Sequence, residues 1–123
     1  MPKVLIVDDD DDLLVLIGHF LKAKGIDFEL AVSTVQARKH LERARFDLVI
    51  SDLDMPGESG FDLFRYVLSQ YPEVRFVIMT GYGDSRTKSE AHSMGVDAYI
   101  EKPFTLSDLL QIAKNLAPDC PKV

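Results

Sequence analysis

The chain has little cysteine, no long apolar run and a shortage of positive charge, and each shortage excludes a class of protein. Its single cysteine, Cys120, cannot form a disulfide within the chain, so we expect a reducing compartment, the cytoplasm. The neighbours Asp119 and Pro121 do not lower a thiol pKa, so Cys120 is not a candidate nucleophile. No apolar run in the sequence is long enough to cross a membrane, so we expect no membrane contact.

The charge balance is acidic, with 14 Lys and Arg against 20 Asp and Glu and a formal net charge of -6. Direct binding of nucleic acid needs clustered Lys and Arg, so this balance argues against it. The 123 residues fit one domain, which we place at 1–117, and 118–123 are expected to be a tail or the start of a linker.

Hydrophobic patterning predicts alternating strands and helices. The apolar runs at 3–7, 48–52 and 74–79 are too short for helices and indicate strands buried on both faces. Residues 28–32 alternate in polarity and 98–100 are short, which is typical of strands at the edges of a sheet. Helical spacing and capping signals predict helices between them and after the last strand, at 13–24, 33–44, 61–71, 85–94 and 105–116.

Five strand–helix units in succession predict a parallel sheet with helices on both faces and right-handed crossovers. Placing the fully apolar strands in the centre gives the order 2-1-3-4-5, a flavodoxin-like doubly wound (βα)5 fold of the α/β class. In such folds ligands bind at the carboxyl ends of the strands, where the order reverses between the first and third strands.

The strand ends deliver an acidic cluster to that edge, namely Asp8, Asp9 and Asp52, together with Thr80 and Lys102. Unit charges about 4 Å apart interact by about 1 kcal/mol in water and several times more near a protein surface. Three carboxylates with one lysine therefore need a further cation, and oxygen ligands with open positions favour Mg²⁺. A carboxylate beside a metal, a lysine and a hydroxyl suits phosphoryl transfer.

Four motifs occur in order along nearly the whole chain and resemble the receiver domains of two-component response regulators: Ile6-Val7-Asp8-Asp9, Ser51-Asp52-Leu53-Asp54-Met55-Pro56, Met79-Thr80-Gly81 and Lys102-Pro103-Phe104. The resemblance implies a switch in phosphorelay signalling, which is not a turnover enzyme. It takes a phosphoryl group from the phosphohistidine of a sensor histidine kinase, or from a phosphotransfer protein, and changes shape.

The resemblance also implies roles for the acidic residues. Asp52 matches the phosphoacceptor. Asp9 matches the direct Mg²⁺ ligand, Asp8 a ligand acting through water, and Asp54 a ligand through its backbone carbonyl, while Asp52 completes the metal set. Lys102 is expected to pair with the acceptor carboxylate and then with phosphoryl oxygens.

Further residues match the family's switch. Thr80 is the hydroxyl that moves toward the phosphoryl group, Gly81 leaves room for that approach, and Tyr99 matches the aromatic residue that turns inward. Lys102-Pro103 matches a peptide bond that is cis in the family. The implied output face is formed by helix 85–94, the strand of Tyr99 and helix 105–116, and it controls an output domain or downstream protein or forms a homodimer.

Simpler interpretations compete at several positions. Asp10 to Asp12 are explained as solvent-facing residues at a helix N-terminus. Asp54 is either a plain turn residue or, with Tyr82, a residue at the mouth of the site that sets how fast water reaches the acyl phosphate. Tyr99 is either the switch or half-buried packing.

Two other functions remain open. Asp52-Leu53-Asp54 resembles the paired aspartates of Mg²⁺-dependent haloacid-dehalogenase-type phosphohydrolases, although that pair usually follows the first strand. A degenerate receiver that binds a partner without phosphorylation is the other alternative. The stretch from Met79 to Gly83 resembles receivers attached to transcription activators of the alternative-sigma class.

Overall fold

The computed structural model describes residues 3–55, 57–81 and 85–116, and within them the predicted alternation of strands and helices is confirmed. The ten elements are β1 Lys3–Val7, α1 Asp11–Ala23, β2 Asp27–Ala31, α2 Thr34–Arg43, β3 Leu48–Asp52, α3 Gly60–Gln70, β4 Arg75–Thr80, α4 Ser85–Met94, β5 Ala98–Glu101 and α5 Leu106–Leu116. Tyr82, Cys120 and the proposed boundary after residue 117 lie outside the described residues, so the expectations about them stay predictions.

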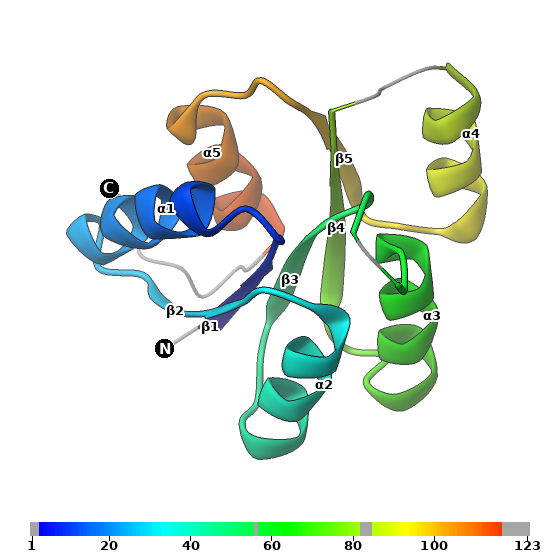
Figure 1. Cartoon of the computed structure of the whole chain (residues 1–123), viewed down its shortest axis with the longest axis horizontal. Helices are drawn as coiled ribbons and strands as arrows, with labels where there is room; N and C mark the ends of the chain where they lie inside the picture. Colours follow the sequence, from blue (N-terminus) through cyan, green and yellow to red (C-terminus); the bar gives the residue numbers. More distant parts are fainter. Residues whose placement is uncertain (1–2, 56, 82–84, 117–123) are drawn as a thin grey trace.

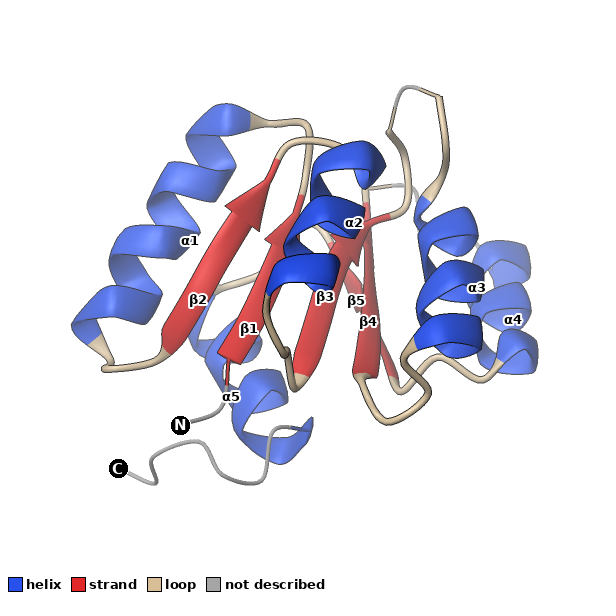
Figure 2. Ribbon diagram, turned by 90° about the horizontal axis from the view of Figure 1, so that it is seen from below, coloured by secondary structure: helices blue, strands red, loops and turns tan. Residues whose placement is uncertain are grey.

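The five strands form one parallel sheet in the order β2-β1-β3-β4-β5, as predicted. Their arrows point in one direction in Figure 2, so their carboxyl ends share one edge of the sheet. The alternating strand β2 and the short strand β5 are the edges, and the apolar strands β1, β3 and β4 are central. The flavodoxin-like α/β fold expected from the sequence is confirmed.

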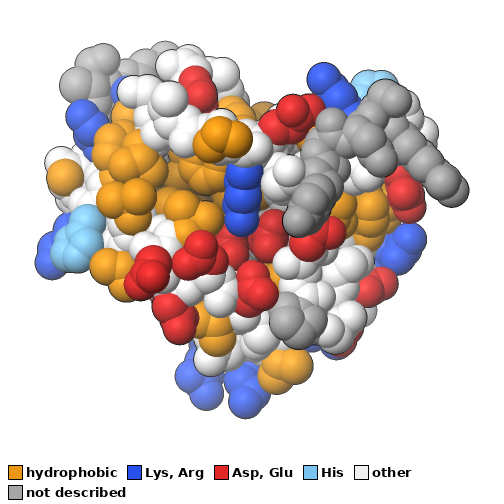
Figure 3. All heavy atoms as spheres, turned by 45° about the horizontal axis from the view of Figure 1, so that its top comes forward, with side chains coloured by type: hydrophobic (Ala, Val, Ile, Leu, Met, Phe, Trp, Pro, Cys, Tyr) orange, Lys and Arg blue, Asp and Glu red, His pale blue; other side chains and the backbone are white. Residues whose placement is uncertain are grey.

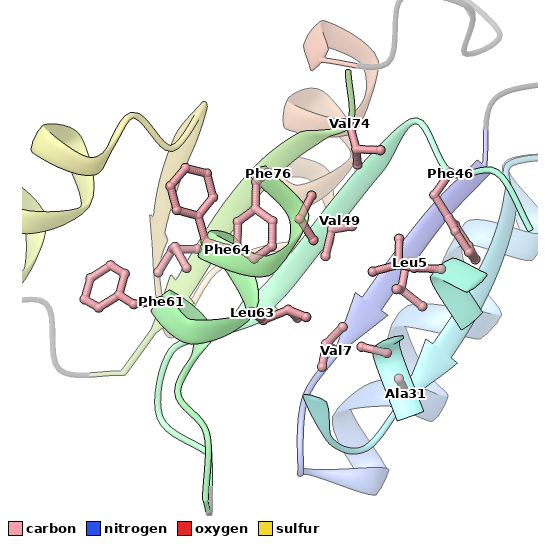
Figure 4. Close-up of a cluster of buried hydrophobic side chains, with 14 of the residues drawn as sticks. Leu5, Val7, Ala31, Phe46, Val49, Phe61, Leu63, Phe64, Val74 and Phe76 are labelled. Carbon is pink, nitrogen blue, oxygen red and sulfur yellow. The ribbon is translucent and has the colours of Figure 1, made fainter. Parts of the chain in front are cut away.

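Each central strand is buried on both faces because successive side chains point to opposite sides of the sheet. Leu5 and Val7 join a cluster with α2, α3 and α4, while Val4 and Ile6 join a second cluster with α1 and α5. The helices are divided in the same way in Figure 1. In the first cluster, Phe64 and Phe76 meet edge to face with ring centroids 5.2 Å apart (Figure 4).

The helix ends follow the capping signals in most cases. Asp10 is the N-cap of α1 and accepts a hydrogen bond from the backbone of Leu13, and Asp11 and Asp12 are exposed, as expected. Ser33 caps α2 by accepting a hydrogen bond from the backbone of Gln36. The Gln36 side chain accepts from the backbone of Val32 and not from that of Ser33, so the reciprocal bond of a capping box is not formed. A full capping box does form at the start of α3.

Two leucines within the predicted helices 13–24 and 61–71 are not part of the core. Leu16 on α1 and Leu68 on α3 are each 53% exposed. On α1 the buried face instead runs through Leu14, Ile17 and Leu21, the i, i+3, i+7 spacing of a single helical stripe. Leu16 lies off that stripe. Counting every apolar residue as buried would therefore overestimate the width of the buried face.

None of the helices in the described part of the chain is long and apolar enough to span a membrane.

We predict that Gly60→Ala destabilises the fold, although alanine is the better helix former by about 1 kcal/mol. A Cβ at position 60 would lie 2.6 Å from the backbone oxygen of Asp52 and 2.9 Å from Cα of Leu53. Both neighbours are backbone atoms at the end of β3, so α3 or the strand end must shift, and the free energy of unfolding should fall by about 1–3 kcal/mol.

Urea unfolding measures this change, with Gly81→Ala as the matched control. A Cβ at position 81 meets nothing within 4 Å, so that variant should stay within about 0.5 kcal/mol of the wild type. Equal stability of Gly60→Ala and wild type would show that the close approach of α3 to β3 is not required.

Candidate functional site

The register of the sheet brings the predicted site residues together. Val7 on β1 pairs with Ser51 on β3, so the next residues along the two strands, Asp8 and Asp52, are neighbours at the carboxyl edge. Asp52 in turn pairs with Met79 on β4, and Thr80 follows Met79 at the end of that strand. The site is therefore a consequence of strand pairing, because each residue ends or directly follows a strand.

Three carboxylates converge at this edge. Ligand oxygens of Asp8, Asp9 and Asp52 all lie within 4.8 Å of one another. Asp8 is 0% exposed and Asp52 4%, whereas Asp9 is exposed to solvent. The space-filling view in Figure 3 shows Asp and Glu side chains gathered next to a basic side chain on one face of the molecule.

Lys102 enters the cluster from the end of β5. Its Nζ donates a hydrogen bond of 2.8 Å to Oδ2 of Asp8 and lies 3.5 Å from Oδ1 of Asp52. Its backbone N–H donates to the carbonyl oxygen of Thr80 at 2.7 Å, and the Lys102-Pro103 peptide bond is cis, as expected. Lys102 thus reaches the Asp52 carboxylate, but its closer contact is with Asp8, which the sequence did not indicate.

The electrostatics single out Asp52. Burial and the nearby Asp8 carboxylate raise the pKa of Asp52 from 3.8 to about 6, against the opposing effects of Lys102 and a backbone hydrogen bond from Asp54. At Lys102, burial lowers the pKa, but the ion pairs with Asp8 and Asp52 outweigh it and the net pKa is raised. Lys102 therefore stays charged, while Asp52 carries a negative charge that its surroundings do not fully neutralise.

Thr80 and Asp54 meet at the rim of the cluster. The Thr80 hydroxyl is fully buried and donates a hydrogen bond of 3.3 Å to the Asp54 side chain, which is itself exposed. This contact agrees with the interpretation of Asp54 as a residue at the mouth of the site.

Tyr99 is half-buried and packs against the hydrophobic cluster that includes residues of α3 and α4. A Cβ at Gly81 would meet nothing within 4 Å.

Comparison with known proteins identifies the family. The family model for the response regulator receiver domain matches residues 4–114. The chain belongs to the response regulator receiver domains. It is therefore a signalling module of two-component systems and not a turnover enzyme, which favours that interpretation over the phosphohydrolase alternative.

Relatives and solved structures agree with this assignment. The response regulator protein FleR of Pseudomonas aeruginosa is 36% identical over 115 residues, covering 94% of this chain and 24% of that protein. The C4-dicarboxylate transport transcriptional regulatory protein DctD of Rhizobium meliloti is 34% identical over 93% of this chain and 25% of its own. The receiver domain therefore spans about a quarter of the length of these relatives.

Among solved structures, a CheY-like receiver domain protein from Methanospirillum hungatei superposes with a TM-score of 0.90. It is 28% identical, and the match covers 97% of this chain and 95% of that chain. The match extends over the sheet and its helices as a whole, so the likeness is not confined to the motifs.

The donor set fits a hard divalent cation. Three carboxylates within 4.8 Å offer the oxygen ligands that Mg²⁺ prefers, and the exposed Asp9 leaves one side of the cluster open to water and phosphate. The raised pKa of Asp52 marks negative charge that a cation at this place would stabilise. The receiver domain therefore has the acidic triad of a metal site.

Two contacts near the site were not predicted from the sequence. The Thr80–Asp54 hydrogen bond joins residues 26 positions apart, and the Arg38–Glu58 ion pair joins α2 to the loop after β3. Neither pair lies at a helical or strand spacing, so no periodic signal in the sequence could have identified them.

We predict that Asp52→Asn stabilises the metal-free domain at neutral pH. The pKa of Asp52 is about 6 when folded and near 3.8 when unfolded, so the folded state binds this proton more tightly. The contribution of the group to stability is complete below pH of about 4 and is lost as the pH rises through about 6. The variant should therefore exceed wild type by about 2–3 kcal/mol at pH 7 and by little at pH 4.

Urea unfolding in the presence of a chelator, repeated between pH 4 and pH 8, measures the difference. Glu73→Gln, which removes an exposed carboxylate at the opposite end of β4, is the control and should show no such pH dependence. Addition of Mg²⁺ should reduce the difference in free energy of unfolding between variant and wild type, because the ion should stabilise only the wild type. A gap that does not change with pH would contradict the assignment of the buried charge to Asp52.

Proposed function

We propose that Asp52 accepts a phosphoryl group from the phosphohistidine of a sensor histidine kinase or phosphotransfer protein. The observation that carries the proposal is the convergence of Asp8, Asp9 and Asp52 within 4.8 Å, with Lys102 between the two buried acids. Family membership supports it, because the sequence motifs that resemble those of receiver domains all lie within the matched residues 4–114.

Mg²⁺ is the cofactor that we propose for the triad, where it would neutralise charge on the transferred phosphoryl group. The exposed Asp9 is the direct ligand. Asp8 would act through water, since its Oδ1 already accepts from the backbone of Asp10 and its Oδ2 from Lys102, whereas no hydrogen bond of this kind within the described residues engages the exposed Asp9. Asp52 and the backbone carbonyl of Asp54 complete the set.

In the transfer step, a carboxylate oxygen of Asp52 attacks phosphorus in line. The new O–P bond forms as the P–N bond of the phosphohistidine breaks, and the imidazole leaves with the electron pair. Lys102, already 3.5 Å from Asp52, exchanges part of its contact with the acids for the phosphoryl oxygens.

The conformational response begins at Thr80. Its hydroxyl donates to Asp54, and movement toward a phosphoryl group on Asp52 would exchange that partner. Tyr99 on β5 pairs in register with Ile78 on β4 and would turn further inward as Thr80 moves. The neighbouring helix α4 contributes only Ala91 to the buried core among its described side chains, so its displacement is inexpensive.

The surface formed by α4, β5 and α5 is the proposed output face, acting on an output domain, a downstream protein or a second copy in a homodimer. The relatives that the chain matches are about four times its length, and one is named as a transcriptional regulatory protein. We infer an output in transcription for the protein that uses this receiver domain, with DNA contact made outside the domain. The cytoplasmic location expected from the sequence stays a prediction.

Our first functional prediction is that acetyl phosphate with Mg²⁺ adds one phosphoryl group, observed as one mass increment in intact-mass spectrometry. Asp52→Asn should remain unmodified, and so should wild type with a chelator. The control is Asp11→Asn, an exposed acid near the site that should still be modified.

The result separates the alternatives. Repeated turnover of a generic phosphate ester would favour a phosphohydrolase. The absence of any modification with acetyl phosphate and with a histidine kinase would favour a binding module that works without phosphorylation.

Our second functional prediction concerns the lifetime of the phosphorylated state. Asp54 and Tyr82 are proposed to control how water reaches the acyl phosphate, and Asp54 also holds the Thr80 hydroxyl. Asp54→Ala and Tyr82→Ala should each change the dephosphorylation rate by up to about tenfold, because one hydrogen bond contributes about 0.5–1.5 kcal/mol and about 1.4 kcal/mol is tenfold in rate. Loss of phosphate is timed by intact mass, with Glu73→Gln as control, and unchanged lifetimes would refute the role.

A further inference from the structure

Arg38 connects α2 with the loop that follows the proposed phosphoacceptor. Its guanidinium Nη2 donates to the carboxylate of Glu58, which lies between β3 and α3. Its Cζ lies 4.8 Å from the ring centroid of Tyr66 on α3. One side chain therefore bridges α2, the loop and α3, the two helices lying on the same side of the sheet in Figure 1.

The loop between β3 and α3 is fixed firmly where it begins and where it ends. Leu53 donates its N–H to the carbonyl oxygen of Met79 at 2.8 Å and accepts from the N–H of Gly60 at 3.0 Å. At the far end, Ser59 caps α3. These bonds close the base of the loop, and the backbone of Asp54 also donates to Asp52, whereas Glu58 farther along the loop is held by its side chain.

The loop carries two carboxylates, those of Asp54 and Glu58, that contact other elements. Asp54 receives the Thr80 hydroxyl, and Glu58 receives Arg38. Both carboxylates are exposed or half-exposed, with the Glu58 side chain at 40%. Among the described residues, Arg38 is the basic side chain that forms an ion pair with this loop, through Glu58.

We propose that Arg38 is a positioning residue for the metal site, and that by holding Glu58 it keeps the loop in the conformation that presents Asp54 to the acidic cluster. The inference rests on the proposed function, because it assigns Arg38 a role in the affinity for Mg²⁺. Arg38 touches neither the three carboxylates nor Lys102 in the described structure, so it acts through the loop alone.

The expected size of the effect follows from the exposure of the pair. The Arg38 and Glu58 side chains are 36% and 40% exposed, so their ion pair and the contact with Tyr66 each shift a conformational equilibrium by about fivefold at most. That is enough to alter a metal affinity severalfold and too little to unfold the domain. Removal of Arg38 should therefore change the affinity for Mg²⁺ measurably and the free energy of unfolding only slightly.

The sign of the effect separates positioning from simple electrostatics. Arg38→Gln removes a positive charge, so Coulomb's law alone predicts tighter Mg²⁺ binding. Glu58→Gln removes a negative charge, so Coulomb's law alone predicts weaker binding. The proposal predicts weaker binding for both, which makes Arg38→Gln the decisive variant.

The experiment is calorimetric titration of the full chain with MgCl₂ alone. Arg38→Gln and Glu58→Gln should each weaken binding by about threefold to fivefold. The double variant should be no weaker than the weaker single variant, because both changes remove one contact. Arg65→Gln is the matched control: it removes an exposed arginine from α3, where the ion pair is with Asp62 on the same helix, and should bind Mg²⁺ at least as tightly as wild type.

Hydrogen exchange without metal gives a second measurement that does not depend on loading the site. Amides of Gly57 and Glu58 should exchange faster in Arg38→Gln than in the wild type, while amides of β3 should be unchanged and thermal midpoints close. Mg²⁺ binding by Arg38→Gln equal to or tighter than that of Arg65→Gln, or additive losses in the double variant, would overturn the role of Arg38 alone. Failure of the wild type to bind Mg²⁺ would overturn this role together with the proposed metal site.

Discussion

The structure depends on two buried carboxylates that share one ammonium group. Asp8 and Asp52 are almost completely removed from solvent, and burying a carboxylate is costly unless it is paired and hydrogen-bonded. Asp8 satisfies that requirement, because Lys102 and the backbone of Asp10 each donate to it. Asp52 satisfies it less completely, and its raised pKa records the difference. Because the ammonium group is shared unevenly, Asp52 is the buried acid whose charge is less completely neutralised.

The fold can carry this local cost because its hydrophobic core is extensive. β1, β3 and β4 are buried on both faces, so the hydrophobic clusters gain free energy along the whole length of these strands, up to Val7 and Met79 beside the site. The capping box of α3 and the close approach of Gly60 to the backbone of Asp52 then fix the strand end against a helix. The unfavourable charges are thus concentrated at a rigid edge, where an ion or ligand can relieve them.

Most of the fold could be predicted from the sequence because short apolar runs and helical periodicity are local signals. The candidate site could be located because Asp8 and Asp52 lie at strand ends, and parallel strands bring their ends to one edge. Contacts that depend on how far side chains reach across elements could not be predicted. The closer pairing of Lys102 with Asp8 is one example, and the bridge from Arg38 to Glu58 is another. The exposed Leu16 shows the same limit on a helix, since the stripe that faces the sheet is set by tertiary packing.

The loop after β3 contacts both a residue of the candidate site and helix α2. It begins one residue beyond Asp52, holds the Thr80 hydroxyl through Asp54 and is held by α2 through Glu58. A change at the acid that withdraws Thr80 from Asp54 therefore acts on β4 and on the loop at once. A perturbation of α2 would act on the same loop from outside. Coupling between sites requires an element whose equilibrium both sites bias, and this loop has contacts with Thr80 on one side and with Arg38 of α2 on the other.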